Sequence, residues 1–229
     1  VKKIVEEVQK FGAYVCVDGV SFAPHGLPNM KKLKADIYLF SSYKTYGPHQ
    51  GVMLLKKRLG VKLPNQGHFF NNQILYKRLS PAGPDHAQVA ACAGIADYFE
   101  GLYNHHFSEP TGTLQKTEAV NNLLQNWERS LMEPLLSYLG DKNSVRLLGP
   151  KTAKNRAPTI AFKSRKLAAE LAKDMAKRNI IVGGDNFYAV RPLEGLGINP
   201  KEGVLRISFV HYTSKSEINR VIEVLDELI

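Results

Sequence analysis

The chain has 229 residues, of which 44% are apolar and 23% are charged, and it carries a formal net charge of +10 and two cysteines. This length and apolar content allow a substantial buried core in one or two domains, which excludes an intrinsically disordered protein. Because no apolar run approaches the roughly 18 residues that a membrane-spanning helix needs, and no signal peptide opens the sequence, we expect a cytoplasmic protein without a membrane partner.

The positive charge raises the question of a nucleic-acid partner. The lysines and arginines are scattered in short groups, and none of these groups is interleaved with exposed aromatic residues as single-strand binding would need. We therefore expect no nucleic-acid partner, and the charge favours the attraction of small anionic ligands. Cys16 and Cys92 lie in apolar segments, which predicts buried, reduced thiols and neither a disulfide nor a metal site.

The first elements alternate between apolar runs and polar loops. The chain opens on the end of a helix and continues into a strand predicted over residues 13–17, followed by a strand over 37–40 and a third over 51–56. The first two runs are short and rich in β-branched and aromatic residues, a pattern typical of strands that are buried on both faces. We expect these to be the last strands of a larger α/β sheet.

Two polar residues follow the first two strands. Asp18 comes directly after the first strand, and Lys44 comes shortly after the second. Ligands of open α/β sheets bind at the carboxyl ends of the strands, so both residues are expected at a binding edge. Ser41 and Tyr43 supply hydroxyl groups beside Lys44. This combination suits a lysine that forms a Schiff base near a phosphate, although an Asp-Gly turn and a solvated lysine are simpler alternatives.

The rest of the chain alternates helices and strands. Helical spacing of apolar residues runs from residue 84 to 107, and a second amphipathic helix is predicted over 113–139, where it bridges two domains. A strand over 159–163, a helix over 166–178, strands over 180–183 and 204–210, and a helix over 215–228 capped by Ser214 follow. This alternation predicts a small α/β C-terminal domain.

Three blocks of the sequence together resemble one enzyme family. Asp18 with the segment SSYKTYGPHQG around Lys44 is similar to the pyridoxal-phosphate site of the class V aminotransferase and cysteine desulfurase family, of fold type I. Residues 79–87, LSPAGPDHA, resemble its glycine-threonine-proline-asparagine loop. Residues 204–213 resemble its C-terminal strand, which bears the arginine that binds the substrate carboxylate. The blocks occur in the order that the family has.

The resemblance implies a fold, a domain arrangement and a dimer. Residues 1–112 would form part of a large, cofactor-binding α/β domain, and residues 113–229 would form an interdomain helix with a small C-terminal α/β domain. In the family, an N-terminal part supplies the rest of the large domain, so the chain is expected to be a fragment or a degenerate relative. A homodimer is implied as well.

The resemblance also assigns roles to five residues at the cofactor site. Lys44 would carry pyridoxal 5'-phosphate as a Schiff base and then move the substrate α-proton. Asp18 would face the ring nitrogen, Ser21 the phenolic oxygen of the cofactor, and Ser41 and Tyr43 the phosphate. No metal site is implied.

Some positions depart from the family pattern. Tyr43 stands where relatives usually have a histidine, and a phenol can donate a hydrogen bond but carries no positive charge. Gly83 stands where relatives have a threonine that reaches the phosphate of the neighbouring subunit. Arg206 would bind the substrate carboxylate, since a buried guanidinium needs an anionic partner; a structural pair with Asp185 is the alternative.

The reaction is less well defined than the family. Residues 182–188, VGGDNFY, resemble the loop that bears the reactive thiol of cysteine desulfurases but contain no cysteine, which argues against desulfuration. We predict an aminotransferase acting on a small amino acid. A desulfurase or selenocysteine lyase, another lyase or epimerase, and a cofactor-free remnant serving as an interaction module stay open.

Overall fold

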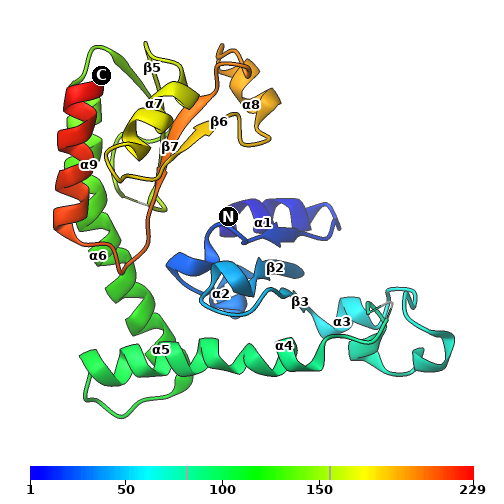
Figure 1. Cartoon of the computed structure of the whole chain (residues 1–229). Coiled ribbons are helices and arrows are strands. Elements are labelled where there is room, and N and C mark those ends of the chain that lie inside the picture. Colours follow the sequence, from blue (N-terminus) through cyan, green and yellow to red (C-terminus); the bar gives the residue numbers. More distant parts are fainter. Residues whose placement is uncertain (81, 155) are drawn as a thin grey trace. The chain divides into compact units, whose positions relative to one another are not determined.

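The computed structural model describes residues 1–80, 82–154 and 156–229, so Pro81 in the LSPAGPDHA block lies outside the described residues. The chain divides into two compact units, Val1–Asn122 and Leu123–Ile229, and helix α6 (Thr113–Asp141) belongs to both (Figure 1). Among the described residues, no helix is long and apolar enough to cross a membrane.

The first unit contains a small sheet surrounded by short helices. Its elements are α1 (Lys2–Lys10), β1 (Cys16–Asp18), η1 (Ala23–His25), α2 (Met30–Leu33), β2 (Ile37–Ser41), η2 (Ser42–Lys44), β3 (Gly51–Leu55), α3 (Lys57–Gly60), η3 (Phe69–Asn71), η4 (Leu75–Lys77), α4 (His86–Ala91), α5 (Ala93–His106) and the start of α6. β1 runs parallel to β2, and β3 is antiparallel to β2 on its other side. The three predicted strands are therefore confirmed, with bounds shifted by a few residues.

The expectation of strands buried on both faces was wrong for the described chain. In β1 the first and last residues are exposed, and in β2 only Tyr38 is fully buried. The thiol of Cys16 is exposed, and Cys92 is partly buried, so the prediction of two buried thiols fails as well. β1 is only three residues long, and two of its three residues are exposed, so an apolar run in the sequence did not ensure that the faces of this strand are covered.

The second unit packs helices on a four-stranded antiparallel sheet. Its elements after α6 are β4 (Val145–Leu148), β5 (Thr159–Ser164), α7 (Ala168–Ala176), β6 (Gly183–Asp185), α8 (Val190–Gly195), β7 (Val204–Ser208) and α9 (Lys215–Leu228). The strand order is β4-β5-β7-β6. The predicted strand over 180–183 lies instead at 183–185, and β4 and α8 were not predicted. The mixed α/β class of the whole chain is confirmed.

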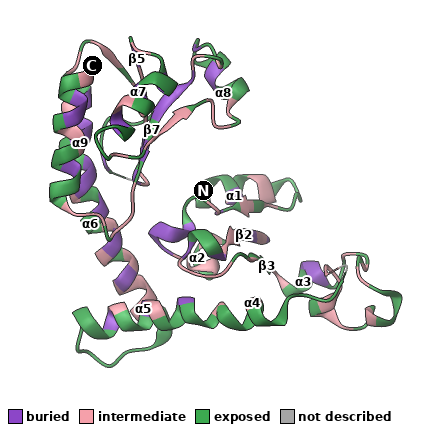
Figure 2. Ribbon diagram, viewed as in Figure 1, coloured by how far each residue is buried: buried purple, intermediate pink, exposed green. Residues whose placement is uncertain are grey.

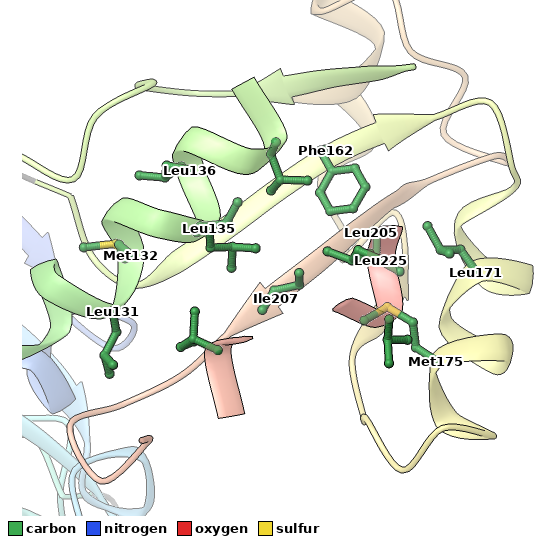
Figure 3. Close-up of a cluster of buried hydrophobic side chains, with 14 of the residues drawn as sticks. Leu131, Met132, Leu135, Leu136, Phe162, Leu171, Met175, Leu205, Ile207 and Leu225 are labelled. Atoms are coloured by element: carbon green, nitrogen blue, oxygen red, sulfur yellow. The ribbon is translucent and has the colours of Figure 1, made fainter. Parts of the chain in front are cut away.

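The core of this unit lies between its sheet and the helices α6, α7 and α9. It includes Leu135, Phe162, Leu171, Leu205 and Leu225, all at most 1% exposed (Figure 3). Figure 2 shows buried stretches along α6, α9 and β7. The predicted cap of α9 is confirmed, because Ser214 Oγ accepts a hydrogen bond from the backbone N–H of Glu217 at 3.2 Å, within a capping box.

Candidate functional site

The carboxyl ends of β1 and β2 meet at one edge of the first sheet because the two strands are parallel. Asp18, the last residue of β1, lies opposite Leu39 in the register, and the N–H of Gly19 donates to the Leu39 carbonyl at 2.8 Å. Ser41 ends β2, and Lys44 ends the 3-10 turn that follows it. The structure thus brings Asp18 and Lys44 to the same edge, as the sequence predicts.

A buried tyrosine packs against Gly19, the residue that follows Asp18. Tyr38 is 3% exposed, and its hydroxyl has no hydrogen-bond partner among the described residues. Burial raises the pKa of Tyr38, and the negative charge of Asp18 raises it further. A Cβ on Gly19 would lie 2.0 Å from this hydroxyl, so the glycine of the Asp-Gly pair is required by close packing. The carboxylate itself is exposed, and its Oδ1 accepts from the N–H of Val20 at 2.9 Å.

The loop that carries Lys44 is closed by the hydroxyl of Ser42. This side chain is fully buried, and its Oγ lies 2.6 Å from the Pro48 carbonyl and 2.7 Å from the Gln50 carbonyl. Thr45 Oγ1 donates to the carbonyl of Ser41 at 3.1 Å on the other side of Lys44. Ser42, two residues before the lysine, and Thr45, directly after it, are therefore held by hydrogen bonds, which leaves Lys44 as an exposed side chain on a fixed backbone.

Helix α5 also constrains this loop. A Cβ on Gly47 would lie 2.6 Å from the Cδ1 of Ile95, so the glycine lets the loop approach this side chain closely. Tyr46 adopts a left-handed backbone with φ of 63°, and its ring lies 5.1 Å from that of Tyr98. The contributions of Ser42, Thr45 and Ile95 to this loop carried no signal in the sequence, because they depend on packing.

The aromatic neighbour of Lys44 is stacked on a histidine. The rings of Tyr43 and His49 are nearly parallel, with centroids 4.7 Å apart, and Lys44 Nζ lies 6.0 Å from the Tyr43 centroid. Both rings are exposed. His49 thus places an imidazole beside Tyr43, the position at which relatives usually have a histidine.

Two other predicted positions lie in loops. Ser21 is exposed in the turn after Asp18, where the N–H groups of Phe22 and Ala23 donate to the Gly19 carbonyl. Gly83 is exposed, and a Cβ there would meet no atom within 4 Å, so packing does not demand a glycine.

A buried carboxylate holds the opposite end of the sheet. Asp36 is 1% exposed and accepts hydrogen bonds from the N–H of Val15 and from Gln9, Lys56 and Arg58 at 2.9–3.2 Å. Burial acts to raise the pKa of Asp36, but these hydrogen bonds outweigh it and hold the pKa well below its usual value. Because it joins the chain before β1 to residues after β3, Asp36 fixes the register of the strands that carry the site.

Arg206 lies in the second unit, on the exposed face of β7. Residues along β7 alternate, so that Leu205 and Ile207 enter the core while Arg206 faces outward, and the premise of a buried guanidinium was wrong. Its Cζ lies 3.9 Å from the ring centroid of Phe187, and among the described residues it forms no ion pair. Asp185, the structural alternative, instead accepts from the N–H of Asn186.

The groups at the edge of the first sheet fit pyridoxal phosphate chemically. A carboxylate suits a protonated ring nitrogen, an amine suits the aldehyde, and the hydroxyls of Ser41 and Tyr43 suit phosphate oxygens. Among the described residues, no three His, Cys, Asp or Glu side chains gather in a way that could hold a metal ion.

Comparison with known proteins gives a consistent result. A family profile described as aminotransferase class-V matches residues 1–78 and 113–221. The chain is 28% identical to the aminotransferase-like protein FGM3 of Gibberella zeae, over 99% of the chain and 54% of that protein, and 28% identical to a probable cysteine desulfurase of Pseudomonas putida, over 94% and 51%. The chain thus spans about half the length of the curated relatives it matches.

Solved structures show the same fold. The cysteine desulfurase of Thermococcus onnurineus matches with a TM-score of 0.79 at 21% identity, over 100% of the chain and 56% of that protein. The cysteine desulfurase CsdA of Escherichia coli matches with a TM-score of 0.78 at 22% identity, over 99% and 54%. From the profile match, the edge that carries Asp18 and Lys44, and this fold, the chain belongs to the class V aminotransferase family, a family of enzymes that depend on pyridoxal phosphate.

Proposed function

We propose that the chain is the Lys44-bearing part of an aminotransferase that acts on a small amino acid. The observation that supports this most is the parallel pairing of β1 and β2, which puts the Asp18 carboxylate and the Lys44 amine at one edge of the sheet. The homodimer and the cytoplasmic location expected from the sequence stay predictions.

Each residue has a distinct task in this proposal. Lys44 holds the cofactor covalently, Asp18 keeps the ring nitrogen protonated, and Ser21 donates to the phenolic oxygen. Ser41 and Tyr43 bind phosphate oxygens. When bound, the cofactor supplies an electron sink that makes the α-proton of an amino acid removable.

Proton transfer then falls to Lys44. In its free, unprotonated form the Lys44 amine would accept the proton from the Cα of the bound amino acid and would later release it again. The fixed loop supports this task, since the backbone on both sides of Lys44 is held by Ser42 and Thr45 while the side chain keeps its freedom. Arg206 would bind the substrate carboxylate through its outward guanidinium.

Transfer is favoured over desulfuration by the absence of a cysteine in residues 182–188. Desulfuration needs a mobile thiolate. The thiol of Cys92 donates to the Gln88 carbonyl at 3.3 Å, within the helical segment α4–α5, which restrains it.

A cysteine desulfurase is the second candidate, because relatives bear that name and the thiol of Cys16 is exposed near the start of β1. Cys16→Ala and Cys92→Ala test it by sulfide release from L-cysteine. Loss of release in either variant would support a sulfur-carrying thiol. Unchanged release in both would exclude these cysteines as carriers.

The main proposal is tested by incubation with pyridoxal phosphate, borohydride reduction and peptide mapping by mass spectrometry. We expect the phosphopyridoxyl adduct on Lys44. Lys57→Ala, which changes an exposed lysine after β3, is the control and should leave the labelling of Lys44 unchanged. Random labelling of surface lysines with Lys44 unmodified would overturn the proposal in favour of a cofactor-free interaction module.

A further inference from the structure

The guanidinium of Arg206, a predicted site residue, lies against the aromatic ring of Phe187. The 3.9 Å between its Cζ and the centroid of Phe187 is well within the range of a cation–π contact. Among the described residues the guanidinium has no carboxylate partner. The N–H donors of a guanidinium lie in its plane, where a carboxylate can accept two of them.

The position of the Phe187 ring is fixed by its neighbours. Gly183 lies opposite Arg206 in the β6–β7 register, and a Cβ on Gly183 would lie 2.7 Å from two ring carbons of Phe187. The absence of a side chain at this position therefore makes room for the ring. The ring also packs against the apolar cluster of Leu193, Ile198 and Val204.

The backbone of the loop directs the ring toward Arg206. Phe187 and Tyr188 are consecutive residues in the left-handed region, with φ of 53° and 60°, a conformation that non-glycine residues seldom adopt. The side chain of Asn186 holds this turn, since its Oδ1 accepts from the N–H of Tyr188 at 3.0 Å. Phe187 faces Arg206 as a result, while Tyr188 is wholly exposed.

We propose that Phe187 is a positioning residue, which holds the Arg206 guanidinium in a fixed plane so that it binds the substrate carboxylate with both donors. This inference rests on the proposed role of Arg206. Phe187 itself need not touch the substrate. Gly183 contributes by leaving space for the ring, which makes a second variant available that disturbs the stack without changing Phe187.

The contact is tested first without substrate. In protein with 15N-labelled arginine, the side-chain Nε–H resonance of Arg206 should carry a ring-current shift, which Phe187→Leu and Gly183→Ala should abolish and Phe187→Tyr should retain. Tyr212→Leu, which changes an exposed aromatic residue of the same unit, is the control and should leave the resonance unchanged. An unshifted resonance in the unaltered protein would overturn the stack.

The function of the contact is tested in the cofactor-loaded protein by spectral titration with L-alanine and with L-alaninamide, which lacks the carboxylate. We expect Phe187→Leu and Gly183→Ala to weaken L-alanine binding by about two- to fivefold and to leave L-alaninamide binding unchanged, with Phe187→Tyr restoring the affinity. Equal weakening for both ligands, or for neither, would overturn the positioning role.

Arg206→Gln, which removes the charge, separates this inference from the proposed function. If that variant loses the preference for L-alanine over L-alaninamide while Phe187→Leu keeps it, Arg206 binds the carboxylate and the role of Phe187 fails alone. If Arg206→Gln keeps the preference, the carboxylate role of Arg206 fails, and the role of Phe187 fails with it.

Discussion

The two units of the chain hold their sheets in different ways. In the second unit, a continuous apolar cluster that includes Leu135, Phe162 and Leu225 covers the sheet. In the first unit the strands are only partly buried, and a polar group, the Asp36 carboxylate, ties their ends together. The difference teaches that the site-bearing sheet depends on directed polar contacts, whereas the second unit depends on apolar burial.

Loss of the amine at the candidate site should have the largest effect. Lys44→Ala is expected to lower the turnover of amino acids by about 10²- to 10⁴-fold and to abolish the absorbance of covalently held cofactor. The melting temperature of the cofactor-free protein should not change, because Lys44 is exposed. Lys57→Ala should retain activity, and equal losses in both variants would contradict the assignment.

A cavity in the second unit should cost the most stability. Phe162 is 0% exposed at the centre of the cluster, so Phe162→Ala should lower the free energy of unfolding by about 3–5 kcal/mol, measured by urea denaturation. Tyr212→Ala removes a ring that is 75% exposed and should cost under about 0.5 kcal/mol. Similar losses in the two variants would show that apolar burial does not distinguish these positions.

The next largest loss of stability is expected at the Asp36 clamp, which consists of the Asp36 carboxylate with Lys56 and Arg58. Asp36→Asn leaves Lys56 and Arg58 without their carboxylate and is expected to lower the free energy of unfolding by about 3 kcal/mol at neutral pH. Glu7→Gln, which changes a carboxylate in an exposed pair with Lys10, should cost under about 1 kcal/mol. Equal stability of the two variants would show that the Asp36 clamp does not stabilise the first unit more than an exposed ion pair does.

The pH dependence sharpens the same contrast. Because the folded pKa of Asp36 lies below its ordinary value of about 3.9, its contribution is complete above that pH and is lost as the pH falls through the folded pKa. The stability difference between the unaltered protein and Asp36→Asn should therefore shrink on acidification below about pH 4. A difference that stays constant down to pH 2 would contradict this linkage.

The smallest effect is expected at the cap of α9. Ser214→Ala removes the side-chain acceptor for the N–H of Glu217 and should cost about 1 kcal/mol. Ser130→Ala is the matched control, because Ser130 lies within α6 and its Oγ donates to the carbonyl of Trp127, so the change should be neutral or slightly stabilising. Equal effects would show that the cap does not stabilise the second unit.

Local signals in the sequence were enough to predict most of the helices and strands. The long helix, the strands at 37–41 and 204–208 and the capped last helix were predictable, since periodicity and capping residues act within a few positions. The strand at 183–185 was displaced in the prediction, because the Gly-Gly-Asp run has no β-propensity and is held by its pairing with β7.

The sequence by itself determined that an aspartate and a lysine follow two neighbouring strands and therefore lie at one edge of a sheet, since this depends only on strand polarity. Tertiary structure alone decided what holds them: Tyr38 under Gly19, Ser42 across the lysine loop and Phe187 beneath Arg206. It also decided that Cys16 and Arg206 are exposed. These contacts join residues that are distant along the chain or depend on which strand face is covered, and neither property is encoded in local spacing.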